Sequence, residues 1–462
     1  MKKFSIKDLA QIIKAHEPQV TSHERRFFTG VSTDSRTIEA GDCFFAIAGN
    51  NFDGHNYVPD AFAKGALCAV VSREIKDSGF ADKAILMVDD TIKAIGDFAR
   101  GYRQQCTFKV VAITGSVGKT TVRQTAYHVL SQHYRLFQAP KNFNNNIGLP
   151  LTLLGADPED KIVIVELGSN HPGEIACLTR IALPDIAVVT NVYPVHLAGF
   201  GNLQTILREK LSISEGLQSD GVLIINVDVL KRLNYQLPLT NHHVITFGKS
   251  DSSNFQARNI TSNGVSSRFT IDGADIYLPL AGPGNIENAL ATWAVCSQFG
   301  ITIDDFAQAV KTLSAVPMRA ELLQIGTLTV LNDCYNANPA SMKNALDILA
   351  ELVSKEKRRA VFICGDMAEL GQYTQDLHAD LGAAVAHAKV QLLLTVGKSA
   401  KIVAESAKNT AKYDLQTKSF TDTLSACNNL KKFIKDYDIV LVKGSRVDKL
   451  EMAVKKLKEL FS

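Results

Sequence analysis

Short apolar runs alternate along most of this chain with segments whose apolar residues recur at helical spacing. Between residues 109 and 315 the apolar runs are 109–114, 161–166, 186–190, 222–226 and 244–247, and beyond Pro317 they are 328–332, 360–364, 391–396 and 438–442. Near-continuous apolar strands joined by helical crossovers are typical of parallel sheets covered on both faces. The pattern therefore predicts an α/β protein in which the second group of strands forms a separate Rossmann-like sheet.

The pattern divides into three parts, as the chain's length of 462 residues allows. The N-terminal part holds strand-like runs at 43–47 and 68–71, followed by a helix-like connector at 91–103. A more polar stretch around 261–280 is the candidate for an antiparallel excursion. We expect three domains: a small α/β N-terminal domain at 1–84, a central domain with a mostly parallel sheet at 85–315, and a C-terminal Rossmann-like domain at 316–462.

The turn after the first strand of the central domain is rich in glycine and carries a lysine. The apolar residues 110–113 lead into this turn, and residues 122–130 after it have helical spacing. The turn consists of Thr114, Gly115, Ser116, Val117, Gly118, Lys119, Thr120 and Thr121. Backbone N–H groups and the dipole of the next helix favour phosphate at such a turn, while a lysine adds charge and a threonine hydroxyl reaches Mg²⁺. The sequence therefore predicts a compact P-loop for a nucleoside triphosphate rather than a tight turn that happens to contain lysine.

Two polar side chains follow the next apolar runs of the central domain. Glu166 ends the run 161–166, and His196 lies in the loop after the run 186–190. Parallel strands bring their carboxyl ends to one sheet edge, so both side chains are expected beside the P-loop. A carboxylate there can bind Mg²⁺ directly or through water. The alternatives are an acid that faces solvent and a structural histidine.

Lys210 lies on the apolar face of a predicted amphipathic helix at 203–217. A lysine on such a face needs a partner or a function. One interpretation is snorkelling, or an ion pair with an acid such as Glu166. The other is a desolvated amine with a lowered pKa, which reacts with CO₂ to give a carbamate that binds metal. Both interpretations stay open on spacing alone.

Several polar segments are candidates for binding a substrate. The loop 140–150 is rich in asparagine, and the segments 332–339, 365–371 and 443–446 each follow an apolar run that points to the edge of the last sheet. The candidate substrate contacts among them are Asn142, Asn146, Asn336, Asn338, Lys443 and Ser445. Each segment could instead be an ordinary polar turn, and Asn338 is well placed to cap the helix that begins at Pro339.

Three further side chains, Arg319, Asp333 and Tyr335, suit a nucleotide, and Asn288 is available near the start of a helix. Asn288 lies in the first turns of a helix that opens at 282–284, and Arg319 lies at the expected boundary before the last domain. In the segment 332–339, Asp333 could accept a ribose hydroxyl and Tyr335 could stack on a base. Arg319 would contact phosphate.

Composition limits the partners of the chain. The net charge of +3 is too small for a nucleic-acid footprint. No apolar stretch is long enough to span a membrane. The eight cysteines are scattered without a Cys-x-x-Cys motif, which fits buried thiols in a reducing cytoplasm better than disulfides or zinc. We therefore expect a cytoplasmic enzyme with small-molecule substrates and without nucleic-acid or membrane partners.

Taken together, these motifs resemble the Mur ligases, the ATP-dependent amide-forming enzymes of peptidoglycan precursor synthesis. The resemblance extends from residues 31–36 to 443–446, nearly the whole chain. Thr-Gly-x-x-Gly-Lys-Thr-Thr at 114–121 marks the superfamily, while Asp-x-Tyr-Asn-Ala-Asn-Pro at 333–339 and Gly-Asp-Met-Ala-Glu-Leu-Gly at 365–371 look like the member that accepts a tripeptide. This likeness implies that D-alanyl-D-alanine is joined to UDP-N-acetylmuramoyl-tripeptide through an acyl phosphate.

The resemblance also implies roles for individual residues. The N-terminal domain would bind the UDP-sugar peptide through its patterned loops, which contain Ser35, Arg36, Asp53 and His55. The family's magnesium positions, two sites in all, match Thr120, Glu166, His196 and Lys210, with Lys210 carbamylated by CO₂. The nucleotide contacts of ATP match Asn288, Arg319, Asp333 and Tyr335. A monomer is expected.

Two other functions are compatible with a P-loop in this setting. A folylpolyglutamate synthase would use the same ATP chemistry on another acceptor, but that family places its P-loop much nearer the start of the chain. A nucleotide-dependent switch would bind ATP without forming a covalent product. It would therefore release no phosphate in response to an acceptor.

Overall fold

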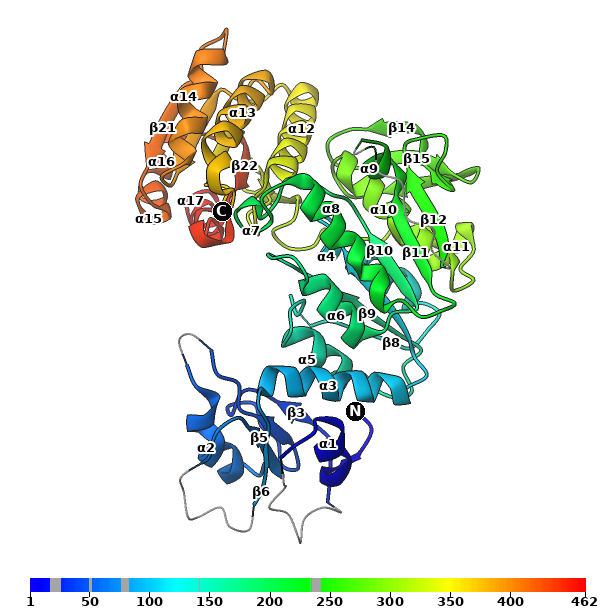
Figure 1. The fold of residues 1–462 in the computed structure, drawn as a ribbon. Helices are drawn as coiled ribbons and strands as arrows, with labels where there is room; N and C mark the ends of the chain where they lie inside the picture. Colours follow the sequence, from blue (N-terminus) through cyan, green and yellow to red (C-terminus); the bar gives the residue numbers. More distant parts are fainter. Residues whose placement is uncertain (17–25, 50–51, 76–82, 141, 233, 235–241) are drawn as a thin grey trace.

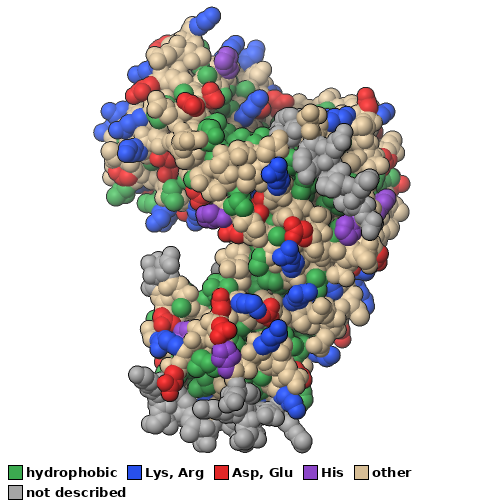
Figure 2. Space-filling view, in the orientation of Figure 1, with side chains coloured by type: hydrophobic (Ala, Val, Ile, Leu, Met, Phe, Trp, Pro, Cys, Tyr) green, Lys and Arg blue, Asp and Glu red, His purple; other side chains and the backbone are tan. Residues whose placement is uncertain are grey.

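The computed structural model describes residues 1–16, 26–49, 52–75, 83–140, 142–232, 234 and 242–462. Figure 1 shows three sheets in succession, the N-terminal one in blue, the central one in cyan and green, and the C-terminal one in yellow to red. In the space-filling view, one side of the molecule is hollowed between the N-terminal and C-terminal parts (Figure 2). The predicted α/β class with mostly parallel sheets is confirmed.

The N-terminal part is built on a four-stranded parallel sheet in the order β3-β4-β5-β6. Aromatic side chains of the long helix α3, Phe98 and Tyr102, pack against Phe4 beneath this sheet. The elements are β1 (Phe4–Ser5), α1 (Ile6–Ile12), β2 (Phe27–Phe28), β3 (Val31–Ser32), β4 (Cys43–Phe45), α2 (Val58–Ala63), β5 (Cys68–Val71), β6 (Ala84–Met87) and α3 (Thr91–Gln105).

The central part is a seven-stranded parallel sheet in the order β13-β12-β11-β10-β7-β9-β8. Its helices cover both faces, because the strands are apolar on both sides (Figure 1). The elements of the sheet and its crossovers are β7 (Lys109–Thr114), α4 (Lys119–Leu130), β8 (Leu136–Gln138), α5 (Gly148–Gly155), β9 (Ile162–Glu166), α6 (Glu174–Ala182), β10 (Ile186–Val189), α7 (Leu197–Phe200), α8 (Leu203–Leu211), β11 (Val222–Asn226), α9 (Val227–Arg232), β12 (His243–Gly248) and β13 (Phe255–Gln256).

The polar stretch around 261–280 forms an antiparallel sheet of three strands, in agreement with the expected excursion. Its strands are β14 (Arg258–Ser262), β15 (Ser267–Ile271) and β16 (Ala274–Leu278), and they are followed by α10 (Pro283–Ser297) and α11 (Ile303–Val310). Helix α10 packs on α4, the helix that follows the predicted P-loop. The start of α10 therefore lies beside the start of α4.

The C-terminal part is a six-stranded sheet in the order β17-β18-β22-β19-β20-β21, in which β17 alone is antiparallel to its neighbour. Its elements are β17 (Glu321–Ile325), β18 (Leu328–Asn332), α12 (Pro339–Glu356), β19 (Ala360–Cys364), the 3₁₀ helix η4 (Gly371–Tyr373), α13 (Thr374–His387), β20 (Leu392–Val396), α14 (Ala400–Thr410), β21 (Gln416–Phe420), α15 (Thr423–Cys427), α16 (Leu430–Phe433), β22 (Ile439–Lys443), the 3₁₀ helix η5 (Arg446–Asp448) and α17 (Glu451–Phe461).

Two expectations about individual elements need correction. The helix predicted at 203–217 ends at Leu211 and continues as a 3₁₀ helix, Ser212–Gly216, because the hydroxyls of Ser212 and Ser214 bond to backbone carbonyls three residues earlier. The asparagine-rich loop is shorter than expected, since α5 already begins at Gly148. The domain boundaries at 84/85 and 315/316 stay predictions.

Candidate active site

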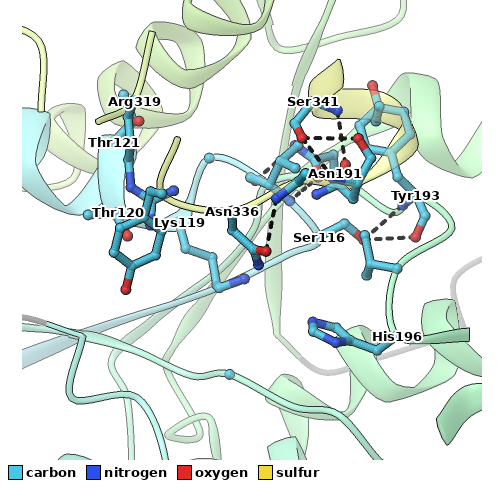
Figure 3. Close-up of a pocket in the computed structure, with 18 of the residues that line it drawn as sticks. Ser116, Lys119, Thr120, Thr121, Asn191, Tyr193, His196, Arg319, Asn336 and Ser341 are labelled. Atoms are coloured by element: carbon cyan, nitrogen blue, oxygen red, sulfur yellow. Dashed lines mark hydrogen bonds between the residues drawn. The ribbon is translucent and has the colours of Figure 1, made fainter. Parts of the chain in front are cut away.

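A cavity of about 1030 Å³ lies where the carboxyl ends of the central strands face the C-terminal sheet. Its wall includes the P-loop, the asparagine-rich loop, the start of α10 and the turns after β18, β19 and β22. Figure 3 shows side chains from both sheets converging on it. Most of the motifs singled out in the central and C-terminal parts of the sequence therefore meet in one place, although they are spread over three hundred residues.

The P-loop is held by two glycines and by the end of β10. Gly115 and Gly118 both have positive φ angles, 145° and 87°. A Cβ on Gly118 would lie 2.2 Å from Asn288 Oδ1, so any other residue there would displace the Asn288 side chain in addition to the strain of the positive φ. The backbone N–H of Val117 donates to Asn191 Oδ1 at 2.9 Å, and Ser116 Oγ donates to the Tyr193 carbonyl at 3.0 Å.

Asn191 and Tyr193 were not expected from the sequence, although they follow directly on the apolar run 186–190. Thr114, by contrast, is buried and donates to the Leu167 carbonyl at 2.9 Å, so it holds the loop to β9 and does not face the cavity. Lys119 opens α4 and donates to the Gly115 carbonyl at 2.6 Å. Burial lowers the pKa of Lys119 to about 8.

Glu166 stands at the end of β9 with both oxygens engaged. Thr120 Oγ1 donates to one oxygen at 3.1 Å, and Arg123 Nε donates to the other at 2.7 Å. The Arg123 and Glu166 side chains are 2% and 1% exposed, which makes this a buried ion pair. Arg123 was missed in the sequence, where its only signal is its place one helical turn after Lys119.

His196 lies at the rim of the same cavity with its imidazole 29% exposed. Its Nδ1 contacts the carboxylate of Glu369, which comes from the C-terminal sheet. Burial lowers the pKa of His196 although Glu369 acts in the opposite direction. The neutral ring is the form that can bind a metal through nitrogen.

Lys210 is buried to 1% exposure on α8 and donates to Ser169 Oγ at 2.8 Å. Its ammonium lies 5.7 Å from the ring centre of Phe200. Burial, with the nearby charge of Lys119, lowers the pKa of Lys210 to about 7. Ser169 lines the cavity, so the amine lies directly behind the wall. Among the described side chains, Lys210 forms no ion pair with Glu166, which favours a desolvated amine over the pairing considered from the sequence.

The donor set beside the P-loop fits Mg²⁺. A hydroxyl and a carboxylate oxygen, from Thr120 and Glu166, already share one hydrogen bond, and both residues line the cavity beside the P-loop. No group of three or more His, Cys, Asp or Glu side chains that could hold a metal occurs among the residues that the structure describes. Mg²⁺ commonly needs only one or two protein oxygens, because phosphates and water supply the rest.

The four nucleotide candidates all line the cavity. The Arg319 guanidinium lies 4.2 Å from the ring centre of Tyr335, and Arg319 is labelled in Figure 3. Asp333 accepts a hydrogen bond from Lys443 Nζ at 2.6 Å. Lys443 is 2% exposed and also donates to the Asn336 carbonyl at 3.0 Å, so it fixes the segment that carries Asp333 and Tyr335.

The remaining substrate candidates fall into two groups. Those that line the cavity are Asn142, Asn146, Asn336, Asn338, Lys443 and Ser445. Asn338 also caps α12, since its side chain accepts from the Ser341 N–H at 2.9 Å. The other group, Ser35, Arg36, Asp53 and His55, lies on the N-terminal part outside this cavity.

Three of the N-terminal candidates belong to two separate polar clusters. Arg36 pairs with Asp34 at 2.7 Å, and this contact lowers the pKa of Asp34 to about 2. Asp53 contacts His55 Nδ1 at 2.6 Å and Arg73 at 3.0 Å. His55 is buried and its Nε2 accepts from the Ser72 N–H at 2.9 Å, so both ring nitrogens are engaged within the protein.

Comparison with known proteins assigns the chain to a family. Models of the Mur ligase family catalytic domain, the Mur ligase middle domain and the Mur ligase glutamate ligase domain match residues 27–103, 113–296 and 318–446. The chain belongs to the Mur ligase family. The predicted family is therefore confirmed, and with it an enzyme that forms amide bonds at the expense of ATP in peptidoglycan precursor synthesis.

Relatives of this Mur ligase match along nearly its whole length. UDP-N-acetylmuramoyl-tripeptide–D-alanyl-D-alanine ligase of Bacillus subtilis is 34% identical over 99% of both chains, and the enzyme of that name from Escherichia coli is 36% identical over 93% of both. A crystal structure of MurF from Acinetobacter baumannii has a TM-score of 0.88 at 28% identity and covers 99% of each chain. No helix in the described part of this Mur ligase is long and apolar enough to cross a membrane.

Proposed function

We propose that this Mur ligase joins D-alanyl-D-alanine to the terminal carboxylate of UDP-N-acetylmuramoyl-tripeptide with ATP as the energy source. The observation that carries the proposal is the single cavity in which the P-loop meets the segments 333–339 and 365–371. The names of the relatives that match over the full length support the same substrates.

ATP is placed by the P-loop and by the turn after β18. The phosphates would lie on the N–H groups at the start of α4, where the helix dipole favours negative charge. Lys119 would leave the Gly115 carbonyl and contact the β- and γ-phosphates. For the nucleoside we assign Asn288, Arg319, Asp333 and Tyr335, which line the same cavity.

The metal positions follow the chemistry of the donors. Thr120 and Glu166 would hold one Mg²⁺, and His196 together with a carbamate on Lys210 would hold a second. When bound, Mg²⁺ supplies positive charge that offsets the repulsion among phosphates and carboxylate. The desolvated amine of Lys210 supports carbamate formation, because only an uncharged amine reacts with CO₂.

The reaction has two steps. The tripeptide carboxylate attacks the γ-phosphorus, so that a carboxylate–phosphorus bond forms and ADP leaves. The amine of D-alanyl-D-alanine then attacks the acyl carbon, loses a proton and expels phosphate as the amide forms. Lys119 stabilises the charge that develops on the transferred phosphoryl group, which is the main electrostatic task of such a site.

We extend the proposal to the substrate-binding residues, the oligomeric state and the cellular location. We assign the UDP-sugar to the N-terminal loops that contain Ser35, Arg36, Asp53 and His55. We assign the peptide and the dipeptide to the cavity residues Asn142, Asn146, Asn336, Asn338, Lys443 and Ser445. We take a monomer as the expected working unit. We also propose that the reaction takes place in the cytoplasm, where its substrate ATP is available.

Phosphate release tests the proposal. ATP, Mg²⁺ and bicarbonate are incubated with the protein, with UDP-N-acetylmuramoyl-tripeptide, D-alanyl-D-alanine, both or neither. Release that requires both substrates, with a product heavier by one dipeptide, is the expected result. ATP binding without release under any substrate pair would favour a nucleotide switch. Release with a pteridine-glutamate acceptor would favour a folylpolyglutamate synthase.

A further inference from the structure

One of the contacts between the C-terminal part and the central part lies next to the active site. Residues 369–373, after β19, meet residues 196–201 around α7. The Ala198 N–H donates to the Glu369 carbonyl at 3.0 Å, and Tyr373 Oη donates to the Gly201 carbonyl at 3.3 Å. Between these backbone contacts the Glu369 carboxylate meets His196 Nδ1. One contact thus joins a predicted metal position to the other half of the cleft.

The backbone on both sides is set for this contact. His196 and Glu369 have φ angles of 49° and 61°. Residues other than glycine rarely adopt this left-handed backbone conformation. Gly371 has a φ of 58°, and a Cβ there would lie 3.2 Å from Ala198 Cα. Such outliers persist where the surrounding structure requires them, and they concentrate at functional sites.

We propose that Glu369 is a positioning residue that orients the His196 imidazole for the metal. Nδ1–H donates to Glu369, which leaves the Nε2 lone pair for the cavity, and Figure 3 shows the ring on the side of the cavity where the Lys119 amine lies. A carboxylate that holds the second nitrogen of a metal-binding histidine fixes both its tautomer and its direction. This inference rests on the proposed function.

His196 belongs to the central part and Glu369 to the C-terminal part, so their contact depends on how the two parts are docked. The His196 ring takes its metal-binding orientation only while the C-terminal sheet is docked on α7. Docking would therefore complete the metal site at the same moment as it brings Lys443 and Ser445 to the cavity. Since an acyl phosphate is destroyed by water, an arrangement that delays phosphoryl transfer until the cleft is assembled protects the intermediate.

The tautomer of His196 tests the positioning role without substrates. The protein is labelled with ¹⁵N-histidine, and the His196 signals are assigned by their loss in His196→Gln. We expect a proton on Nδ1 in the native protein and a shift of that proton toward Nε2 in Glu369→Ala. Glu405→Ala, which removes an exposed carboxylate on α14, serves as the matched control and should leave the signals unchanged. An unchanged tautomer in Glu369→Ala overturns the proposal.

Kinetics give the second readout. Glu369→Ala should lower kcat about 10- to 100-fold and raise the Mg²⁺ concentration for half-maximal activity, as loss of such an outer partner does elsewhere. The KM for ATP should stay near its native value, because the P-loop is untouched; a rise in the KM for ATP alone contradicts the proposal.

Gly371→Ala keeps the carboxylate but obstructs docking at Ala198. It should change the Mg²⁺ requirement in the same direction, and it keeps the test decisive if Glu369→Ala fails to fold. A Gly371→Ala protein with a native Mg²⁺ requirement would overturn the link to docking. One outcome is that the protein releases no phosphate with UDP-N-acetylmuramoyl-tripeptide and D-alanyl-D-alanine while the tautomer still depends on Glu369. In that case the proposed function fails and the positioning contact stands.

Discussion

Replacing Lys210 with methionine should make the protein more stable at neutral and acidic pH while it abolishes ligase activity. Lys210 is a buried amine on α8 with one described hydrogen-bond partner, Ser169 Oγ. Methionine has a similar length and no charge to desolvate. The substitution therefore removes the desolvation cost of the buried amine. It also removes the nucleophile that would react with CO₂.

The magnitude follows from the lowered pKa of Lys210, about 7 against 10.5 for the unperturbed amine. Between these values the unfolded chain binds a proton that the folded chain does not, so native stability rises with pH across this window. At pH 6 the unfavourable contribution is about 5 kcal/mol, and near pH 10 it has fallen to about 1 kcal/mol. The stability gained by Lys210→Met should therefore shrink by about 4 kcal/mol over this range.

The assay is urea unfolding of the native and Lys210→Met proteins from pH 6 to pH 10, followed by tryptophan fluorescence of Trp293 in the central part. Groups that titrate alike in both proteins drop out when one free energy of unfolding is subtracted from the other. A stability difference that stays flat with pH would refute the argument that Lys210 is held uncharged. Native-like ligase activity in Lys210→Met would refute its role in the metal site.

Three further substitutions test other charged side chains in or near the cleft. Lys119→Ala should abolish turnover with an unchanged circular dichroism spectrum, and near-normal activity would disprove the phosphate role of Lys119. Arg123→Leu leaves Glu166 buried without its cation and should lower the free energy of unfolding by about 3–5 kcal/mol in urea titrations. Burial and then the charge of Asp366 raise the pKa of Asp448 to about 7, so its contribution to stability falls as pH rises toward that value. Asp448→Asn should therefore be more stable by about 1–2 kcal/mol at pH 8, after allowance for its partial exposure, and equally stable near pH 3 by thermal unfolding.

Much of the fold could be predicted because the buried strands are apolar on both faces. Strands β7, β9, β10, β11, β18, β19, β20 and β22 all coincide with apolar runs within a residue or two. The edge strands β8, β13, β17 and β21 lack such runs, since an edge strand contacts few neighbours and tolerates polar residues. The 3₁₀ segment after Leu211 was missed because serine hydroxyl bonds to the backbone carry no periodic signal.

The site divides in the same way. Glycine and lysine in the P-loop, and acids at strand ends, have local signatures, so Lys119 and Glu166 could be found from the sequence. Arg123 contacts Glu166, Ser169 contacts Lys210, and Asn191 contacts the P-loop at Val117. These contacts join segments that are 43, 41 and 74 residues apart. Glu369 lies inside a motif that was noticed, but its partner His196 is 173 residues away. Only the three-dimensional arrangement reveals these pairings.

The central claim is that ATP activates the carboxylate of the tripeptide substrate. It is tested by placing ¹⁸O in that carboxylate and analysing the phosphate released in the presence of D-alanyl-D-alanine. We predict that each phosphate carries one oxygen from the substrate, because the acyl carbon–oxygen bond breaks when the amine attacks. Phosphate that contains no substrate oxygen, formed while the amide product accumulates, would contradict the acyl phosphate mechanism.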